Sequence, residues 1–116
     1  MSALPAQHVR AATPSDVGPI TDLMRGLAEY EKLTHLFIAT DELLHDALFG
    51  PHPAAECLAA EVDGAVIGYA LFFHNYSTFL GRKGLYLEDL YVHPDHRGKG
   101  LGKTMLSRLA ALGGGK

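Results

Sequence analysis

Three glycines alternate with larger residues in a short segment that also carries two basic side chains. The segment reads Arg97-Gly98-Lys99-Gly100-Leu101-Gly102, and Lys103 follows it. Glycine lets the backbone approach a ligand closely and adopt positive φ angles. A strand-like stretch precedes the segment and a helix-like stretch follows it, so the unpaired N–H groups of the helix start point at the same place. The pattern predicts a binding loop for a phosphate or diphosphate.

Two familiar phosphate loops do not fit this segment. A Walker A loop, GxxxxGK[ST], needs one more residue between its glycines, and Arg97 stands where its first glycine belongs. A dinucleotide fingerprint, GxGxxG, needs glycine at position 103, where lysine stands. A glycine-rich turn without a ligand is the simplest alternative. The order strand, loop, helix favours a binding loop over that alternative.

The elements that must position this loop follow from hydrophobic periodicity and from turn residues. The predicted strands are 8–11, 56–62, 65–75 and 85–92, and Asp63-Gly64 favours a two-residue hairpin between the second and the third. The predicted helices start at Thr13, Thr40 and about Gly100, and end near Glu31, before Gly50-Pro51 and at Leu112. The order β-α-α-β-β-β-α predicts an α/β (α+β) protein with a mainly antiparallel central sheet flanked by helices.

Composition excludes several classes of function. The 116 residues predict one domain over 1–112, with 113–116 as a flexible tail. A net charge of −3 gives no support to nucleic-acid or anionic-membrane binding. No apolar run approaches the roughly 20 residues of a membrane span, and the N-terminus lacks signal-peptide features. The single cysteine, Cys57, favours the cytoplasm and a core role. His93, Asp95 and His96 are expected to shape the loop or lie at the surface rather than bind a metal.

Beyond these patterns, the string RGKGLG resembles the (Q/R)xxGx(G/A) diphosphate loop of the GNAT superfamily of N-acetyltransferases. Five segments carry the resemblance further, in the same order: LAEYEKL (27–33), LLHDALFG (43–50), ECLAAEVDG (56–64), VIGYALFF (66–73) and LYLEDLYVHPDHRGKGLG (85–102). Together they are similar to the diamine acetyltransferase group, which includes the spermidine/spermine and thialysine Nε-acetyltransferases. Tyr30-Glu31-Lys32-Leu33 is more similar to the thialysine branch, because the polyamine branch carries an acidic pair where Thr34-His35 stand here.

The resemblance implies transfer of an acetyl group from acetyl-CoA to the primary amine of a small molecule, either thialysine- or lysine-like or a diamine or polyamine. A primary amine has a pKa of about 10.4, so about one molecule in 2,500 is neutral at pH 7 and a base is needed. Glu88 matches the family glutamate that takes this proton through water; a solvated strand glutamate is the alternative. Strand alternation predicts that Glu88 and Tyr86 share one face of the strand, while Asp89 faces the other way.

The resemblance also implies which residues contact the two substrates. Acetyl-CoA is expected along the open edge of the last strand and in the loop, at Leu90, Tyr91, Val92, Arg97, Gly98, Lys99, Gly100, Leu101, Gly102 and Lys103. The amine is expected near Tyr30, Glu31 and Asp89, where carboxylates would attract a cation. The alternatives are an ordinary polar helix end for Tyr30 and Glu31, and a structural role for Asp89.

The chain departs from the family after Leu112, where Gly113-Gly114-Gly115-Lys116 ends it. Family members continue for several tens of residues, which supply a fifth strand, another helix, a final hairpin and a tyrosine that protonates the leaving thiolate. The resemblance therefore predicts a GNAT fold truncated after the helix that follows the loop, with the general acid unassigned. Three explanations stay open: a fragment, a homodimer whose partner covers the open edge, or a non-catalytic acyl-CoA-binding or interaction module.

Overall fold

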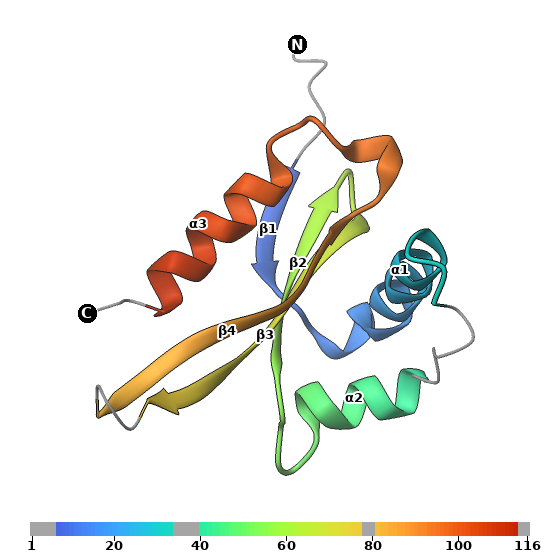
Figure 1. The fold of residues 1–116 in the computed structure, drawn as a ribbon. Coiled ribbons are helices and arrows are strands. Elements are labelled where there is room, and N and C mark those ends of the chain that lie inside the picture. The colour runs from blue at the N-terminus through green and yellow to red at the C-terminus, as the bar shows by residue number, and fades with distance from the viewer. Residues whose placement is uncertain (1–6, 34–39, 78–80, 114–116) are drawn as a thin grey trace.

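Four strands form one antiparallel sheet in the computed structural model, which describes residues 7–33, 40–77 and 81–113 (Figure 1). The strands are β1 (Gln7–Ala11), β2 (Glu56–Val62), β3 (Ala65–Ser77) and β4 (Arg82–Val92). They lie in the order β1-β2-β3-β4, and every neighbouring pair is antiparallel. The predicted sheet is confirmed, although β3 ends later, at Ser77, and β4 begins earlier, at Arg82, than predicted. Within the described residues, β4 is an edge strand.

Three helices cover the two faces of this sheet (Figure 1). They are α1 (Val17–Tyr30), α2 (Asp41–Phe49) and α3 (Leu101–Gly113), and two short 3-10 turns, η1 (Pro14–Asp16) and η3 (Pro94–His96), stand before α1 and α3. The predicted element order is confirmed. The last helix runs to Gly113, one residue into the segment expected to be a tail; residues 114–116 lie outside the described part of the chain. No helix of the described residues is long and apolar enough to span a membrane.

The sheet separates two hydrophobic cores. On one face, the core residues of α3 pack against inward-facing residues of all four strands, with Phe72 and Met105 buried at the centre. On the other face, α1 and α2 pack against the sheet around Ile20 and Tyr69, both of which have no exposed surface. Cys57 belongs to this second core, and burial raises the pKa of its thiol to about 12. This placement confirms Cys57 as a core residue.

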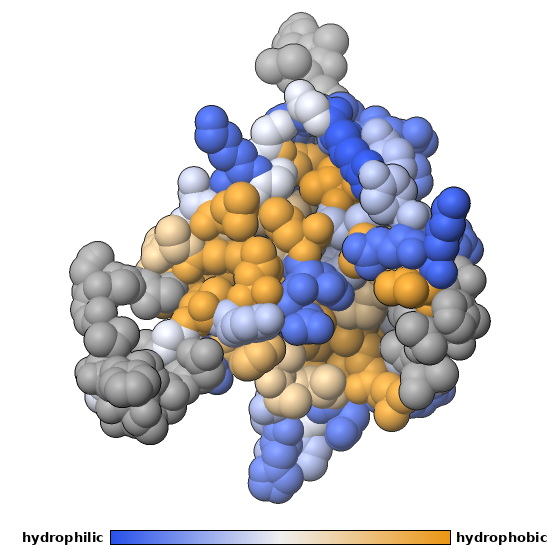
Figure 2. Space-filling view, viewed as in Figure 1, coloured by the Kyte–Doolittle hydropathy of each residue, from blue (hydrophilic) through white to orange (hydrophobic). Residues whose placement is uncertain are grey.

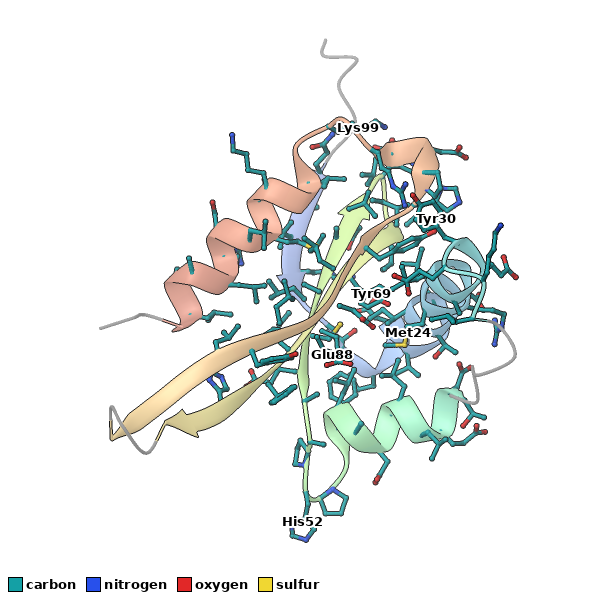
Figure 3. All side chains as sticks on the ribbon, in the orientation of Figure 1. Met24, Tyr30, His52, Tyr69, Glu88 and Lys99 are labelled. Carbon is teal, nitrogen blue, oxygen red and sulfur yellow. The ribbon has the colours of Figure 1, made fainter. Side chains whose placement is uncertain are left out.

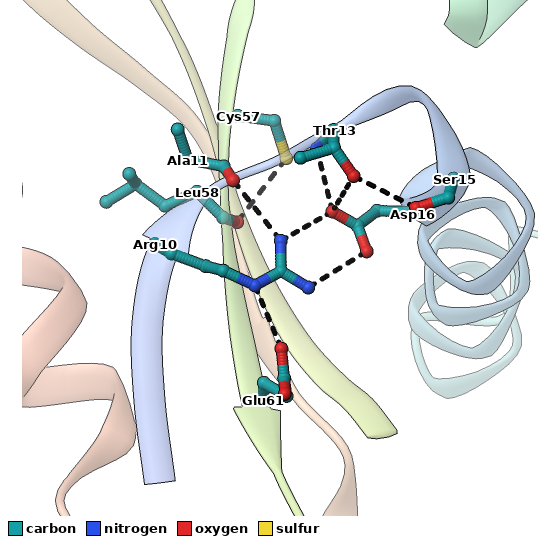
Figure 4. A network of polar contacts seen from close by, with 8 residues as sticks. All are labelled: Arg10, Ala11, Thr13, Ser15, Asp16, Cys57, Leu58 and Glu61. Carbon is teal, nitrogen blue, oxygen red and sulfur yellow. Dashed lines mark hydrogen bonds and ion pairs between the residues drawn. The ribbon is translucent and has the colours of Figure 1, made fainter. Parts of the chain in front are cut away.

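The predicted helix start at Thr13 is a 3-10 turn that leads into α1 (Figure 4). The Thr13 amide donates to the Asp16 carboxylate over 2.7 Å, which satisfies one orphan donor of the turn. Asp16 is buried and receives two hydrogen bonds from the Arg10 guanidinium, at 2.7 and 3.1 Å, while Arg10 Nε donates to Glu61. The Arg10 guanidinium holds the pKa of Asp16 below its usual range, and the two carboxylates raise the pKa of Arg10. The network ties β1, β2 and η1 together.

Local turn chemistry explains the other element boundaries. The Thr40 hydroxyl accepts the Leu43 amide at the start of α2, as an N-cap residue does. Asp63 and Gly64 have φ angles of 51° and 84°, which suit the hairpin that the sequence predicts. Helix α1 ends with Lys32 at φ 60°, where the amides of Lys32 and Leu33 donate to the carbonyls of Glu29 and Ala28. This is a Schellman cap with lysine at the position that usually holds glycine.

Candidate coenzyme and amine site

The glycine-rich loop connects β4 to α3 in a conformation that depends on two of its glycines. Gly98 and Gly100 have φ angles of 83° and 80°, in the left-handed region that favours glycine. Leu101 is buried against the sheet and fixes the start of α3. The Thr104 amide and hydroxyl both donate to the Gly100 carbonyl over 2.9 Å and close the first helical turn. The loop therefore presents exposed backbone at the positive end of a helix.

A pocket of about 460 Å³ opens between this loop, the end of β4 and the end of α1. All the predicted coenzyme residues except Lys99 line it: Leu90, Tyr91, Val92, Arg97, Gly98, Gly100, Leu101, Gly102 and Lys103. The tertiary structure thus brings together residues that the sequence places on a strand, a loop and a helix. Lys99 instead donates to Nδ1 of His96 over 3.1 Å and lies outside the pocket lining.

The last residues of β4 direct alternate backbone groups toward the open edge of the sheet. The His93 amide donates to the Ile67 carbonyl of β3, and Tyr91 pairs with Tyr69. In an antiparallel pair, hydrogen-bonded residues alternate with residues whose N–H and C=O groups point away from the partner strand. Leu90 and Val92 are residues of the second kind, so their N–H and C=O groups point to the open side. Tyr91 also lines the pocket, but its backbone N–H and C=O groups face β3.

Arg97 is held by three contacts at the wall of this pocket. Its Nε donates to the Val92 carbonyl over 2.8 Å. The guanidinium carbon lies 5.6 Å from the ring centroid of Tyr30 and 5.4 Å from that of Tyr91. These are cation–π distances, and the planar guanidinium suits such contacts.

Glu88 lies at a β-bulge, and this overturns the predicted alternation of β4. Leu71 pairs with Asp89 while Phe72 pairs with Leu87, so Glu88 is the extra residue of β4. Leu87 packs on the α3 side, so its neighbour Tyr86 lies on the α1–α2 side, as Asp89 does. The prediction that Tyr86 and Asp89 face opposite ways is wrong, because one inserted residue inverts the two-residue period.

The carboxylates expected to act on the amine are not among the residues that line the pocket. Glu88 is exposed near the middle of β4, whereas Lys99 marks the loop at the far end of the strand (Figure 3). The Asp89 carboxylate accepts a hydrogen bond from the buried Tyr69 hydroxyl over 3.3 Å. Among the described residues, Glu88, Asp89 and Glu31 are not part of the pocket lining, while Tyr30 is. Thr34 and His35, which bear on the choice of amine, lie outside the described residues.

Leu27 and His96 also line the pocket and were not predicted from the sequence. Leu27 stands three residues before Tyr30, so both side chains follow one face of α1. That spacing is visible in the sequence, but it also fits an ordinary core position. His96 lies directly before the loop, and the sequence predicts only a loop-shaping or surface residue there. No group of three histidine, cysteine or acidic side chains suited to a metal ion occurs in the described ranges.

Apolar side chains are also exposed next to the site, over α3 and the neighbouring part of β4 (Figure 2). Leu106 and Leu112 of α3 are about half exposed, and Leu85, Leu87 and Leu90 of β4 are only partly buried.

Comparisons with known proteins agree with this geometry. The model of the acetyltransferase (GNAT) family matches residues 20–115. A thialysine N-epsilon-acetyltransferase of Mus musculus is 40% identical over 113 residues, which are 90% of this chain and 66% of the mouse protein. The Bos taurus protein of the same name is 41% identical over 112 residues, covering 90% of this chain and 65% of that protein. The chain thus spans about two thirds of the length of these curated relatives.

A solved structure extends the comparison to the fold. The crystal structure of a ribosomal-protein-alanine N-acetyltransferase from Brucella melitensis biovar Abortus 2308 superimposes with a TM-score of 0.73 at 28% identity. The match covers 91% of this chain and 70% of that chain. Loop, sheet, family match and structural neighbour lead to one conclusion: the chain belongs to the acetyltransferase (GNAT) family.

Proposed function

We propose that this chain binds acetyl-CoA in the pocket between β4, the loop and α1, and that it serves acetyl transfer to the primary amine of a small molecule. One observation carries the proposal. A loop suited to a diphosphate and an unpaired strand edge suited to a chain of amides meet in the same pocket. A nucleotide that lacks a pantetheine arm would use only the loop.

Each part of the pocket matches one part of acetyl-CoA. The backbone N–H groups around Gly98 and Gly100, together with the charge of Lys103, suit the diphosphate. The open N–H and C=O groups of Leu90 and the N–H of Val92 suit the amides of the pantetheine arm, because a strand edge pairs with any extended amide chain. The Val92 carbonyl is already used by Arg97. Acetyl-CoA is a co-substrate here, and its thioester would lie further along β4, toward the bulge.

Glu88 is proposed as the general base. Its place in the bulge frees it from the regular alternation of β4 and exposes it to water, through which it would take the proton of the bound ammonium group. The neutral amine then attacks the thioester carbonyl carbon, the carbon–sulfur bond breaks, and the leaving thiolate takes up a proton. A base is needed because only the neutral amine can attack, and removing its proton at pH 7 costs about 4.6 kcal/mol.

A thialysine- or lysine-like amine is the proposed substrate class, with diamines and polyamines as the alternative. The similarity to thialysine acetyltransferases favours the first. Tyr30 and Glu31 at the end of α1 and Asp89 on β4 would attract the ammonium group, although only Tyr30 lines the coenzyme pocket. A homodimer and a cytoplasmic location are also proposed, the latter because Cys57 is a buried free thiol.

Calorimetry with CoA and with ATP, followed by acetyl transfer to thialysine, lysine, spermidine and diaminopropane, tests the proposal. CoA binding with transfer to one of these amines is the expected result. Tight ATP binding without CoA binding would overturn it. CoA binding without transfer to any amine would favour a non-catalytic acyl-CoA-binding module. Light scattering of the same sample reports whether the 12.5 kDa chain forms dimers.

A further inference from the structure

The side chain of Arg97 links three elements that are far apart in the sequence. Arg97 begins the phosphate loop, Tyr30 ends α1 and Tyr91 lies near the end of β4. The guanidinium lies over both rings, at 5.6 and 5.4 Å, and its Nε is tied to the Val92 carbonyl at 2.8 Å. A guanidinium engaged on two ring faces and by one hydrogen bond is held in place rather than free to follow a ligand.

The close approach of α1 to β4 makes this arrangement possible. A Cβ atom on Gly26 would lie 3.2 Å from the Tyr91 hydroxyl oxygen, so a larger residue at this point of the helix would have to displace the Tyr91 side chain by a few tenths of an ångström. Glycine disfavours the helical state, so its presence inside α1 points to a packing requirement. Leu27, the next residue, and Tyr30, one turn after Gly26, line the pocket. Tyr30 is 70% exposed as a residue, and the Arg97 guanidinium is one of the groups that contact its ring.

We propose that Arg97 is a positioning residue that fastens the phosphate loop to the end of α1, and that this contact with Tyr30 sets the affinity for the coenzyme. The inference rests on the proposed function, since it takes CoA as the ligand of the pocket. In this arrangement, Lys103 supplies positive charge to the diphosphate, while Arg97 holds the loop in the conformation that binds it.

The contact also joins the coenzyme pocket to the proposed amine site. Tyr30 lines the pocket, and Glu31 follows it directly at the end of α1. A coenzyme that packs against Tyr30 therefore stabilises the helix end that would receive the amine. Because such coupling is reciprocal, the amine strengthens coenzyme binding by the same factor.

The proposal is tested by measuring CoA affinity in variants that separate the positive charge of a side chain from its planar stacking group. Arg97→Lys keeps the charge but loses the planar stacking group, and we expect it to weaken CoA binding roughly tenfold. Lys103→Gln is the matched control for charge, and its effect should shrink at high salt, whereas that of Arg97→Lys should persist. Tyr30→Phe keeps the ring face and should retain the CoA affinity within about twofold, while Tyr30→Leu should weaken it roughly fivefold. Thermal denaturation of each variant checks that it is folded.

The double variant Arg97→Lys/Tyr30→Leu decides between a shared contact and two separate ones. If Arg97 acts through Tyr30, the second substitution adds less than about a twofold loss to the first. Two results would overturn the inference: a loss of CoA affinity in the double variant equal to the product of the two single losses, or wild-type CoA affinity in Arg97→Lys. The proposed function would still stand in both cases, as long as the wild-type chain binds CoA. Failure of the wild-type chain to bind CoA would overturn both.

Discussion

The hydroxyl of Tyr69 donates a 3.3 Å hydrogen bond to the carboxylate of Asp89, across two neighbouring strands at the bulge that carries Glu88. The Tyr69 ring is fully buried beneath α1 and α2, so the bond anchors Asp89 from the interior of the protein. Burial, reinforced by the nearby Asp89 charge, raises the pKa of Tyr69 well above its usual value. The backbone next to the proposed base is thereby held by a core residue.

Replacing Tyr69 with phenylalanine removes this bond and keeps the ring. We expect Tyr69→Phe to lower the free energy of unfolding at pH 7 by about 1 kcal/mol, measured by urea denaturation. Because the folded-state pKa of Tyr69 is raised, the tyrosine contributes fully to the free energy of unfolding below about pH 10. This contribution is lost as the pH rises above that value, where the unfolded chain ionises first. The wild-type protein should therefore lose more stability than Tyr69→Phe above pH 10. Equal alkaline losses would contradict this assignment.

Asp16→Asn breaks the ion pair at the start of α1. The Asp16 side chain is only 6% exposed, but that of Arg10 is 36% exposed, so the expected loss is about 2 kcal/mol, less than for a fully buried pair. The folded-state pKa of Asp16 is lowered, so its contribution is present above its ordinary pKa and disappears as the pH falls through the lower, folded-state value. Urea denaturation between pH 7 and pH 2 should show the difference between the two proteins shrinking at acid pH. A constant difference would argue against the ion pair.

Glu88→Gln removes the proposed base without a change of size. The expected result is a fall in kcat of roughly 10²- to 10⁴-fold with an unchanged Kd for CoA, because a general base acts in the transition state. Asp89→Asn, one residue away, is the comparison variant and should change the KM for the amine more than kcat. Parallel losses of CoA affinity and rate in Glu88→Gln would remove Glu88 from this role.

Gly100→Ala and Gly102→Ala separate backbone strain from side-chain bulk in the loop. Neither new Cβ atom would meet a heavy atom within 4 Å, but Gly100 has a φ of 80°, whereas Gly102 needs no positive φ. Gly100→Ala should cost about 1 kcal/mol of stability and weaken CoA binding at least tenfold as the loop shifts. Gly102→Ala should leave stability nearly unchanged. Similar stability losses in both variants would mean that the φ of Gly100 is not the cause.

Lys32→Gly should stabilise the protein, because Lys32 occupies the left-handed position of the Schellman cap at the end of α1. Relief of this strain is expected to add about 0.5 to 1 kcal/mol to the free energy of unfolding. Lys32→Ala removes the same charge without relieving φ and serves as the control. A gain in the alanine variant as large as in the glycine variant would attribute the effect to charge instead.

Local chemistry made much of the fold and part of the site predictable. The strands, the hairpin at Asp63-Gly64 and the N-cap at Thr40 follow from side-chain periodicity and from turn preferences, which act within a few residues. The phosphate loop was recognisable for the same reason, since its glycines, basic residues and helix start are contiguous. The Schellman cap at Lys32 escaped prediction because the residue that usually marks it, glycine, is absent.

The sequence by itself determined the order of the elements, the loop and the family to which the chain belongs. Only the tertiary structure decided that Glu88 would be the extra residue of a bulge, because a register depends on the partner strand and not on the period of one strand. The same holds for the ring contacts of Arg97, which bring together residues 30, 91 and 97. Contacts between distant segments arise from packing of the whole sheet with its helices, and no local preference encodes them.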